Sequence, residues 1–156
     1  MKSNSGFSPE QGDKAFDSLI RSLSYRAHSR KELEDKLRQK GFTEEERDYA
    51  ISRAARLELI DDGEYAAGLA SSLLKYKGFA PSRIRLELMG RGIDRDLIDA
   101  ALEKLESDPA ERAAELLGTK FASYTYEKAF SALTRLGYDA DDIKHALRET
   151  GVDFND

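Results

Sequence analysis

The sequence has 156 residues and no cysteine, which excludes disulfides, thiolate nucleophiles and cysteine-based metal sites. Its formal net charge is -5, yet residues 1–93 sum to +2 and residues 94–156 to -7, an asymmetry that concerns partners and not the fold. No apolar run approaches the ~20 residues that cross a bilayer, and the N-terminus lacks a hydrophobic signal core. We therefore expect a cytoplasmic protein with no membrane partner.

The N-terminal segment begins polar and then becomes amphipathic. Residues 1–12 contain Gly and Pro among polar residues and are expected to form a flexible tail. Asp13 is the expected N-cap of a helix over about 14–27, whose apolar residues recur at helical spacing. These residues are Phe16, Leu19, Ile20 and Leu23.

Two capping-box patterns follow, Ser29 with Glu32 and Thr43 with Glu46. In each, a hydroxyl oxygen and a carboxylate three residues later satisfy orphan backbone N–H groups at the start of a helix. We expect a helix to begin at both points, and Gly41 to end the first of them. The expected inward residues of the next helix are Ile51, Ala54 and Ala55, with Leu57 as a further candidate.

The later helix starts are marked by aspartate, proline or threonine. The expected caps and first-turn residues are Asp61, Pro81, Asp94, Asp108 with Pro109, Thr125 and Asp139. Gly78 should end the helix that Asp61 begins, and the apolar stripe of that helix would be Tyr65, Leu69, Leu73 and Tyr76. No alternating run long enough for a β-strand occurs, so the sequence predicts an all-α protein.

A glycine-centred pattern occurs three times. Gly41, Gly92 and Gly137 each follow a core pair at minus eight and minus four, and each precedes an apolar residue and an N-cap. The spacings of 51 and 45 residues predict three tandem three-helix repeats, helix-turn-helix-like, stacked into an elongated, curved array. We assign an N-terminal tail, three repeats and a C-terminal tail to residues 1–12, 13–58, 59–106, 107–150 and 151–156.

Three segments together resemble the RecX family of bacterial regulatory proteins. They are S-R-K-E-L-E-D-K-L-R-Q-K-G-F at 29–42, L-I-D-D-G-E-Y-A at 59–66 and Y-K-G-F-A-P-S-R-I-R-L-E-L-M-G-R-G-I-D at 76–94. The third, a Lys-Gly-aromatic-x-Pro-x-Arg-Ile run that ends in a glycine turn, is the most specific. The resemblance covers roughly residues 15–148 and is weakest in the third repeat.

The resemblance implies a partner and a mode of action. RecX proteins are known as three-repeat arrays that bind the RecA recombinase filament, lie along its groove, and restrain strand exchange, ATP hydrolysis and coprotease activity. The resemblance implies that the chain modulates RecA, in the first place by inhibiting it, in DNA repair, recombination and the SOS response. It implies no chemistry of the chain's own, and we expect a monomer.

Two basic clusters are the strongest functional signal in the residues themselves. Residues 75–91 hold five cations against Glu87, and residues 26–40 hold six against three acids. A charge run is often only a solvated face, but homologous helices of adjacent repeats can place these clusters on one side of the array. Such a stripe would meet nucleic-acid phosphate or an acidic protein groove. Its predicted contact residues are Lys36, Arg38, Lys40, Lys75, Lys77, Arg83, Arg85 and Arg91.

Other polar residues are better explained by structure than by chemistry. Adjacent helical residues diverge by about 100°, so we interpret Asp61 as a cap and Asp62 as a first-turn residue and not as a metal or catalytic pair. Tyr65 is interpreted as a core aromatic whose hydroxyl reaches a partner. His28 and His145 are expected to be exposed or partly packed, without metal-ligand spacing. We expect no catalytic residue, metal or cofactor.

Two alternatives to a filament modulator remain open. A stand-alone helix-turn-helix DNA-binding regulator would read bases with the helix after each glycine turn, but these helices start with the acidic segments T-E-E-E-R-D, D-R-D-L-I-D and D-A-D-D-I-K. A generic helical-repeat adaptor would use the same array for another protein. The acidic C-terminal part favours contacts shared between a protein filament and its DNA, with the third repeat reaching protein.

Overall fold

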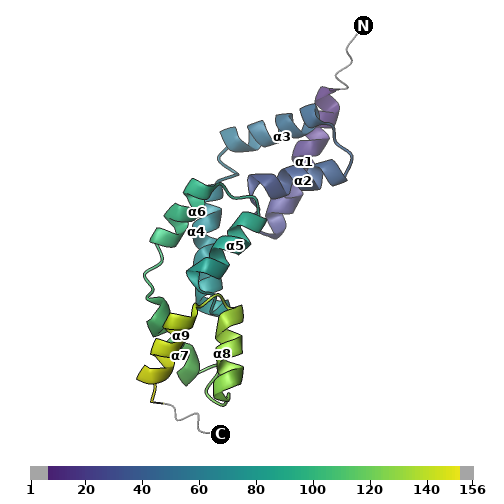
Figure 1. Ribbon diagram of the computed structural model, residues 1–156. Helices are drawn as coiled ribbons and strands as arrows, with labels where there is room; N and C mark the ends of the chain where they lie inside the picture. Colours follow the sequence, from purple (N-terminus) through teal and green to yellow (C-terminus); the bar gives the residue numbers. More distant parts are fainter. Residues whose placement is uncertain (1–6, 152–156) are drawn as a thin grey trace.

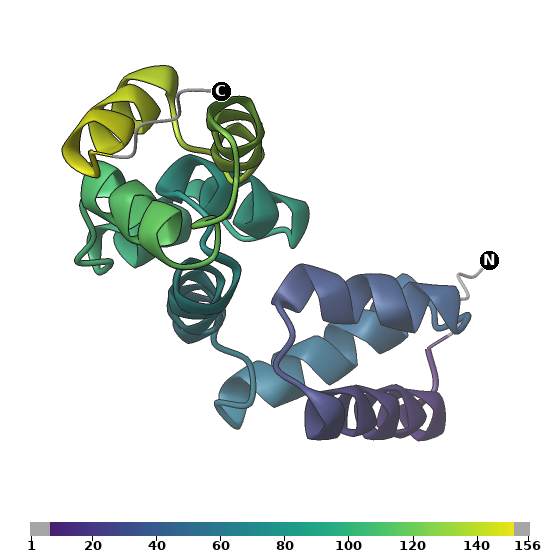
Figure 2. The same ribbon diagram turned by 90° about the horizontal axis from the view of Figure 1, so that it is seen from below.

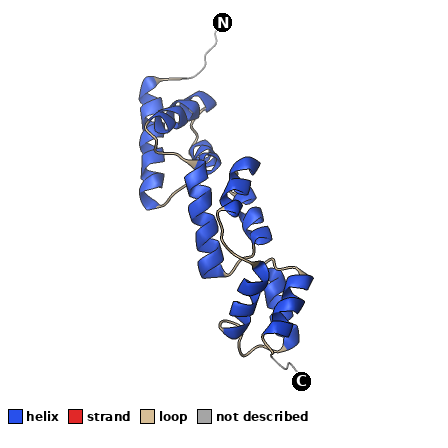
Figure 3. Ribbon diagram, turned by 90° about the vertical axis from the view of Figure 1, so that its left-hand side faces the viewer, coloured by secondary structure: helices blue, strands red, loops and turns tan. Residues whose placement is uncertain are grey.

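The chain is helical throughout the part that the structure describes. A computed structural model describes residues 7–151, in which α-helices and one π-helical segment, η1, are joined by short connections, with no strand in this range (Figure 3). The prediction of an all-α protein is confirmed. The elements are α1 (Pro9–Tyr25), α2 (Arg30–Gln39), α3 (Glu44–Arg56), α4 (Asp62–Ser72), η1 (Leu73–Lys77), α5 (Pro81–Gly90), α6 (Arg95–Glu103), α7 (Pro109–Gly118), α8 (Tyr126–Arg135) and α9 (Ala140–Glu149).

Most helices begin at the predicted caps. Ser29 and Thr43 each form a complete capping box, in which both the hydroxyl and the glutamate bonds are present. Pro81 is the first residue of α5, as predicted. Asp94 stands at the N-cap of α6, but its side chain makes no capping bond. The other predicted caps accept a hydrogen bond from a first-turn N–H: Asp61, Asp108, Thr125 and Asp139.

The predicted start of the first helix is wrong. Helix α1 begins at Pro9 with Ser8 as its N-cap, and not at Asp13. Gly12 is buried against Tyr49 of α3, where a Cβ would lie 2.8 Å from the ring, so this end of α1 is packed. Residues 1–6 of the predicted N-terminal tail and 152–156 of the predicted C-terminal tail lie outside the described residues.

Four residues predicted on buried faces are instead exposed, namely Ile20, Ala55, Leu57 and Tyr76. Leu57 is 55% exposed because it is the C-cap residue of α3, where the helical face ends. Tyr76 is 73% exposed because it lies in η1, whose wider winding turns it off the apolar stripe of α4. Helical spacing alone therefore overestimates the buried face where a helix ends or changes its winding.

Each set of three consecutive helices encloses its own hydrophobic cluster. The first and third helices of each set pack most extensively, α1 with α3, α4 with α6 and α7 with α9. We call these sets repeat 1, repeat 2 and repeat 3. Ala80 lies in the chain segment predicted as repeat 2 but is buried in the cluster of repeat 3. The core pairs before the turn glycines are buried in these clusters, namely Leu33 and Leu37, Ile84 and Leu88, and Ala129 and Leu133.

The repeats form an elongated array with α1 and α9 toward opposite ends of the molecule (Figure 1). Seen from below, the repeats are offset from one another, so the array is not a straight stack (Figure 2). Within residues 7–151, no helix is long and apolar enough to span a membrane.

The middle helices of the repeats meet end to end. At joint 1, between repeats 1 and 2, the Ser29 hydroxyl at the N-cap of α2 donates to the carbonyl of Arg91 at the end of α5, at 2.6 Å. At joint 2, between repeats 2 and 3, the Ala80 N–H at the N-cap of α5 donates to the carbonyl of Leu136 at the end of α8, at 2.8 Å. Each acceptor immediately precedes a turn glycine, so the joints repeat one arrangement. We call α8, α5 and α2 the middle-helix row.

The turn glycines serve both a helix end and a joint. Gly41, Gly92 and Gly137 have φ angles of 91°, 76° and 100°, in the left-handed region that favours glycine. A Cβ on Gly92 would collide with Lys31, and one on Gly137 would lie 2.9 Å from the backbone nitrogen of Arg83. Gly41 has no repeat packed on it, and a Cβ there would have nothing within 4 Å.

Candidate interaction surface

The middle-helix row brings the two predicted basic clusters onto adjoining elements. Residues 26–40 include all of α2, and residues 75–91 include all of α5. Because α2 begins where α5 ends, the two clusters are continuous across joint 1 (Figure 1). A basic surface that spans two repeats is thus compatible with the fold.

Three of the four exposed lysines among the predicted contact residues donate no side-chain hydrogen bond within residues 7–151, namely Lys36, Lys75 and Lys77. The side chains of Lys36 and Lys77 make neither a hydrogen bond nor an ion pair within residues 7–151. The Lys75 ammonium lies 5.3 Å from the centre of the Tyr76 ring. Lys75 and Lys77 both belong to η1, and Arg112 of repeat 3 donates to the Lys75 carbonyl at 3.2 Å, which fixes this segment against the next repeat.

Three other predicted contact residues are paired within their own repeat. Arg38 lies 2.9 Å from Asp35, and Lys40 donates to the Ser18 hydroxyl at 2.7 Å. The guanidinium of Arg85 lies 2.8 Å from Asp99. Exposed ion pairs such as those of Arg38 and Arg85 contribute only about 0–1 kcal/mol, so these two cations can exchange their partners for those of a bound molecule.

The side chains of Arg83 and Arg91 contact the neighbouring repeat at the joints. The sequence predicts surface cations at both positions, but their side chains contribute to packing between repeats. Arg91 donates to the Tyr65 hydroxyl at 2.9 Å and lies 3.6 Å from Glu32 of repeat 1. Arg83 donates to the Arg135 carbonyl of repeat 3 at 2.9 Å. Charge reversal at either arginine would therefore disturb the array as well as any bound partner.

Glu32 is the centre of the polar contacts at joint 1. It accepts hydrogen bonds from Arg26 at 3.1 Å and from the Ser29 N–H at 3.0 Å. Burial alone would raise the pKa of Glu32, but the hydrogen bonds from Arg26, Ser29 and Tyr65 outweigh it and lower the pKa to about 2. The prediction that the Tyr65 hydroxyl reaches a partner is confirmed, although Tyr65 is half-buried at a joint and not enclosed in a core.

Asp61 and Asp62 have separate roles. Asp61 accepts the Glu64 N–H at 3.0 Å and caps α4, as predicted. Asp62 stands in the first turn, as predicted, and also accepts the N–H of Arg30 at 2.8 Å across joint 1. Nothing in the local pattern indicates this second contact, because it joins positions 32 residues apart.

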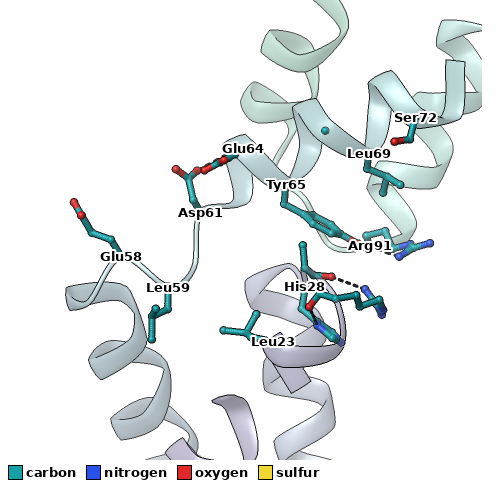
Figure 4. Close-up of a pocket in the computed structure, with 13 residues that line it drawn as sticks. Leu23, His28, Glu58, Leu59, Asp61, Glu64, Tyr65, Leu69, Ser72 and Arg91 are labelled. Atoms are coloured by element: carbon teal, nitrogen blue, oxygen red, sulfur yellow. Dashed lines mark hydrogen bonds between the residues drawn. The ribbon is translucent and has the colours of Figure 1, made fainter. Parts of the chain in front are cut away.

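A cleft of about 830 Å³ opens between repeats 1 and 2 beside joint 1 (Figure 4). On one side of it lie the carboxylates of Glu58, Asp61 and Glu64, and on the opposite side lies Arg91 (Figure 4). An apolar centre with charges of both signs suits a polypeptide segment better than a phosphate backbone. The apolar lining includes Leu23, Leu59 and Leu69.

His28 is buried at the wall of this cleft. The sequence predicts an exposed or partly packed histidine, but the residue is 3% exposed. Its Nδ1 lies 3.0 Å from the Arg26 carbonyl, while its Nε2 has no hydrogen-bond partner in the described chain. Burial lowers the pKa of His28, so the neutral ring with its proton on Nδ1 fits this geometry. His145 is exposed, as predicted, and its Nε2 lies 3.1 Å from Glu149.

Curated relatives match most of the chain. The chain is 33% identical over 141 residues to a protein named regulatory protein RecX from Chlorobium phaeobacteroides, covering 88% of this chain and 91% of that protein. The chain belongs to the RecX family. A regulatory protein RecX from Haemophilus influenzae is 36% identical over 115 residues, covering 73% of this chain and 75% of that protein.

The RecX match extends to domains and to a solved structure. Residues 15–53 match the RecX first three-helix domain, and residues 61–102 match the RecX second three-helix domain. The crystal structure of RecX from Lactobacillus salivarius superposes with a TM-score of 0.75 at 27% identity, covering 90% of this chain and 97% of that chain. Joint 1, with its contacts from Ser29, Glu32 and Arg91, lies within the two matched RecX domains.

Proposed function

We propose that this chain binds the filament that the RecA recombinase forms on DNA and inhibits its recombinase, ATPase and coprotease activities. Membership in the RecX family supplies the partner, through the resemblance noted above. The observation that carries the proposal is the basic surface that continues from η1 and α5 to α2 across joint 1, on which the side chains of Lys36 and Lys77 are exposed without internal partners.

The array suits a filament because its own fold repeats. Repeats joined end to end place equivalent helices at successive positions, so one molecule can bridge successive subunits of a helical polymer. A bound array would block access of a second strand or a protein substrate. It would also shift the filament between growing and disassembling states, according to which state it binds better.

Charge divides the proposed contacts between DNA and protein. The exposed lysines of α2 and η1 suit phosphate or an acidic protein groove, whereas the acidic residues 94–156 would repel phosphate. We therefore infer that repeats 1 and 2 reach the DNA within the filament and that repeat 3 contacts protein.

A stand-alone helix-turn-helix regulator is disfavoured by the third helix of each repeat. Such a regulator would insert the N-terminal residues of this helix into the major groove. The first turn of α3 contains Glu44, Glu45 and Glu46, and the first turn of α9 contains Asp141 and Asp142. These carboxylates complement the helix dipole but would repel DNA. A generic adaptor would use the same array, and only family membership separates it from the proposal.

Co-sedimentation with preformed RecA filaments on single-stranded DNA tests the proposal. The wild-type chain should pellet with the filament at low salt and less so as salt increases. The double substitution Lys36→Glu and Lys77→Glu should weaken this binding. The matched control Lys104→Glu and Lys144→Glu makes the same charge change at exposed lysines outside the two basic clusters and should bind like wild type. Absence of wild-type chain from the pellet at low salt would overturn the proposal.

A further inference from the structure

The outer face of α5 carries two exposed apolar side chains. Leu86 and Met89 are 63% and 57% exposed. Residues three apart on a helix are surface neighbours, so the two side chains form one apolar patch. Single exposed apolar residues need no explanation, but an apolar pair beside a groove is a feature of interaction sites.

The other repeats are polar at the equivalent positions. Counted back from each turn glycine, the equivalents of Leu86 and Met89 are Asp35 and Arg38 in repeat 1 and Ser131 and Thr134 in repeat 3. In repeat 1 the two equivalents form an ion pair at 2.9 Å. The three-helix scaffold therefore does not require apolar residues here, and repeat 2 has them for a reason other than folding.

Met89 also lines an open groove of about 550 Å³ in repeat 2. Ile93 and Ile98 give the groove an apolar floor and are 5% and 1% exposed. Arg95, on α6, lines the groove and is exposed, and its side chain makes neither a hydrogen bond nor an ion pair to any residue that the structure describes. The groove therefore offers an apolar surface next to an unpaired cation.

We propose that this groove binds a protein subunit of the filament, through a segment that carries an apolar side chain and a carboxylate. The apolar side chain would pack against Met89 and the isoleucine floor, and the carboxylate would pair with Arg95. The inference rests on the proposed function and deepens it, because it adds a protein contact in repeat 2 to the one inferred for repeat 3.

The chemistry of the groove favours protein over nucleic acid. Base stacking needs an aromatic face, and the groove lining contains no aromatic residue. Its second arginine, Arg85, is paired with Asp99, whose carboxylate would repel phosphate. Leucine and methionine side chains add nothing to a phosphate contact, whereas an apolar side chain with an adjacent carboxylate satisfies both the floor and Arg95.

The test is a double variant that copies repeat 3, Leu86→Ser with Met89→Thr. Because both side chains are exposed, the variant should keep the wild-type circular dichroism spectrum and unfolding midpoint. Its affinity for RecA filaments in co-sedimentation should fall about tenfold or more, because apolar contact area is lost. The matched control Leu57→Ser removes a leucine that is 55% exposed and lies outside the groove, and it should bind like wild type.

Arg95 provides a second, independent variant. Arg95→Glu should weaken filament binding, and Arg95→Lys should retain most of it, because only the charge is needed for the pairing. If the double variant and Arg95→Glu both bind filaments as well as wild type does, the groove assignment is overturned and the proposed function stands. A wild-type chain that does not bind filaments would overturn the proposed function and this assignment with it. A double variant that also lost affinity for free single-stranded DNA would assign the groove to nucleic acid and contradict the inference.

Discussion

The Ser29 hydroxyl at the start of α2 donates a 2.6 Å hydrogen bond to the carbonyl of Arg91, 62 residues later in the chain. The same hydroxyl accepts the N–H of Glu32 at 3.1 Å. One side chain therefore caps a helix and links two repeats. Ser29 is 0% exposed, so water cannot replace either contact when the hydroxyl is removed.

Ser29→Ala should be more destabilising than the equivalent substitution Thr43→Ala. Both residues form complete capping boxes, so each substitution should cost about 1 kcal/mol for the lost cap. Ser29→Ala also leaves the Arg91 carbonyl without this donor, which should add about 1 kcal/mol. Urea unfolding of the two variants measures the difference, and equal losses of stability would contradict a structural role for joint 1.

The three turn glycines should respond differently to alanine. All three share the cost of a left-handed alanine, which is about 1 kcal/mol. Gly41→Ala should cost little more, because the space around its Cβ is open. Gly92→Ala and Gly137→Ala should cost about 1–3 kcal/mol more, because the new methyl group collides with the neighbouring repeat. Thermal unfolding measures the order, and a uniform effect would show that the joints are not tightly packed.

The stability contributed by Glu32 should be lost in acid. Its pKa is lowered from 4.5 to about 2, so its ionised form is favoured by folding. This contribution is present above pH 4.5 and declines as the pH falls toward about 2. Glu32→Gln should be less stable than wild type at neutral pH and should lose less stability on acidification. Unfolding measured as a function of pH checks this, and parallel curves would argue against the charged network.

Glu58→Gly should stabilise the protein. Among the residues that the structure describes, Glu58 is the non-glycine residue with a positive φ angle, which is 58°. Gly151, which follows α9, has the same φ angle. Glycine removes the steric cost of the left-handed conformation, which is about 1 kcal/mol, although its greater freedom when unfolded offsets part of the gain. Glu58→Ala retains the steric cost and is the control. An unfolding midpoint for Glu58→Gly at or below that of Glu58→Ala would be inconsistent with backbone strain at this position.

Local patterns predicted the helices well because their causes are local. The capping boxes at Ser29 and Thr43 and the left-handed glycines at 41, 92 and 137 depend on neighbouring residues alone. The start of α1 was missed because Ser8 and Pro9 form an equally good cap and first turn. The sequence around Gly12 does not indicate that this glycine lies inside a helix. Its contact with Tyr49, which is distant in the sequence, shows why a glycine is tolerated there.

The candidate site was less predictable because it depends on contacts between repeats. Counting charges along the sequence finds the basic clusters. It does not show that the side chains of Arg83 and Arg91 contribute to the joints between repeats. The burial of His28 also follows from the packing of repeat 2 against a polar segment of repeat 1. The sequence does contain a signal for the groove beside Met89. When the three repeats are aligned, only repeat 2 has apolar residues at the positions of Leu86 and Met89.

DNA-dependent ATP hydrolysis by RecA, measured across a titration with this chain, tests the central claim most directly. We predict that the rate falls to a plateau as the filament is occupied. The variant with Lys36→Glu and Lys77→Glu should need a concentration on the order of tenfold higher for the same effect, and the Lys104→Glu and Lys144→Glu control should match wild type. A rate that stays unchanged at a large excess of the wild-type chain would contradict the account.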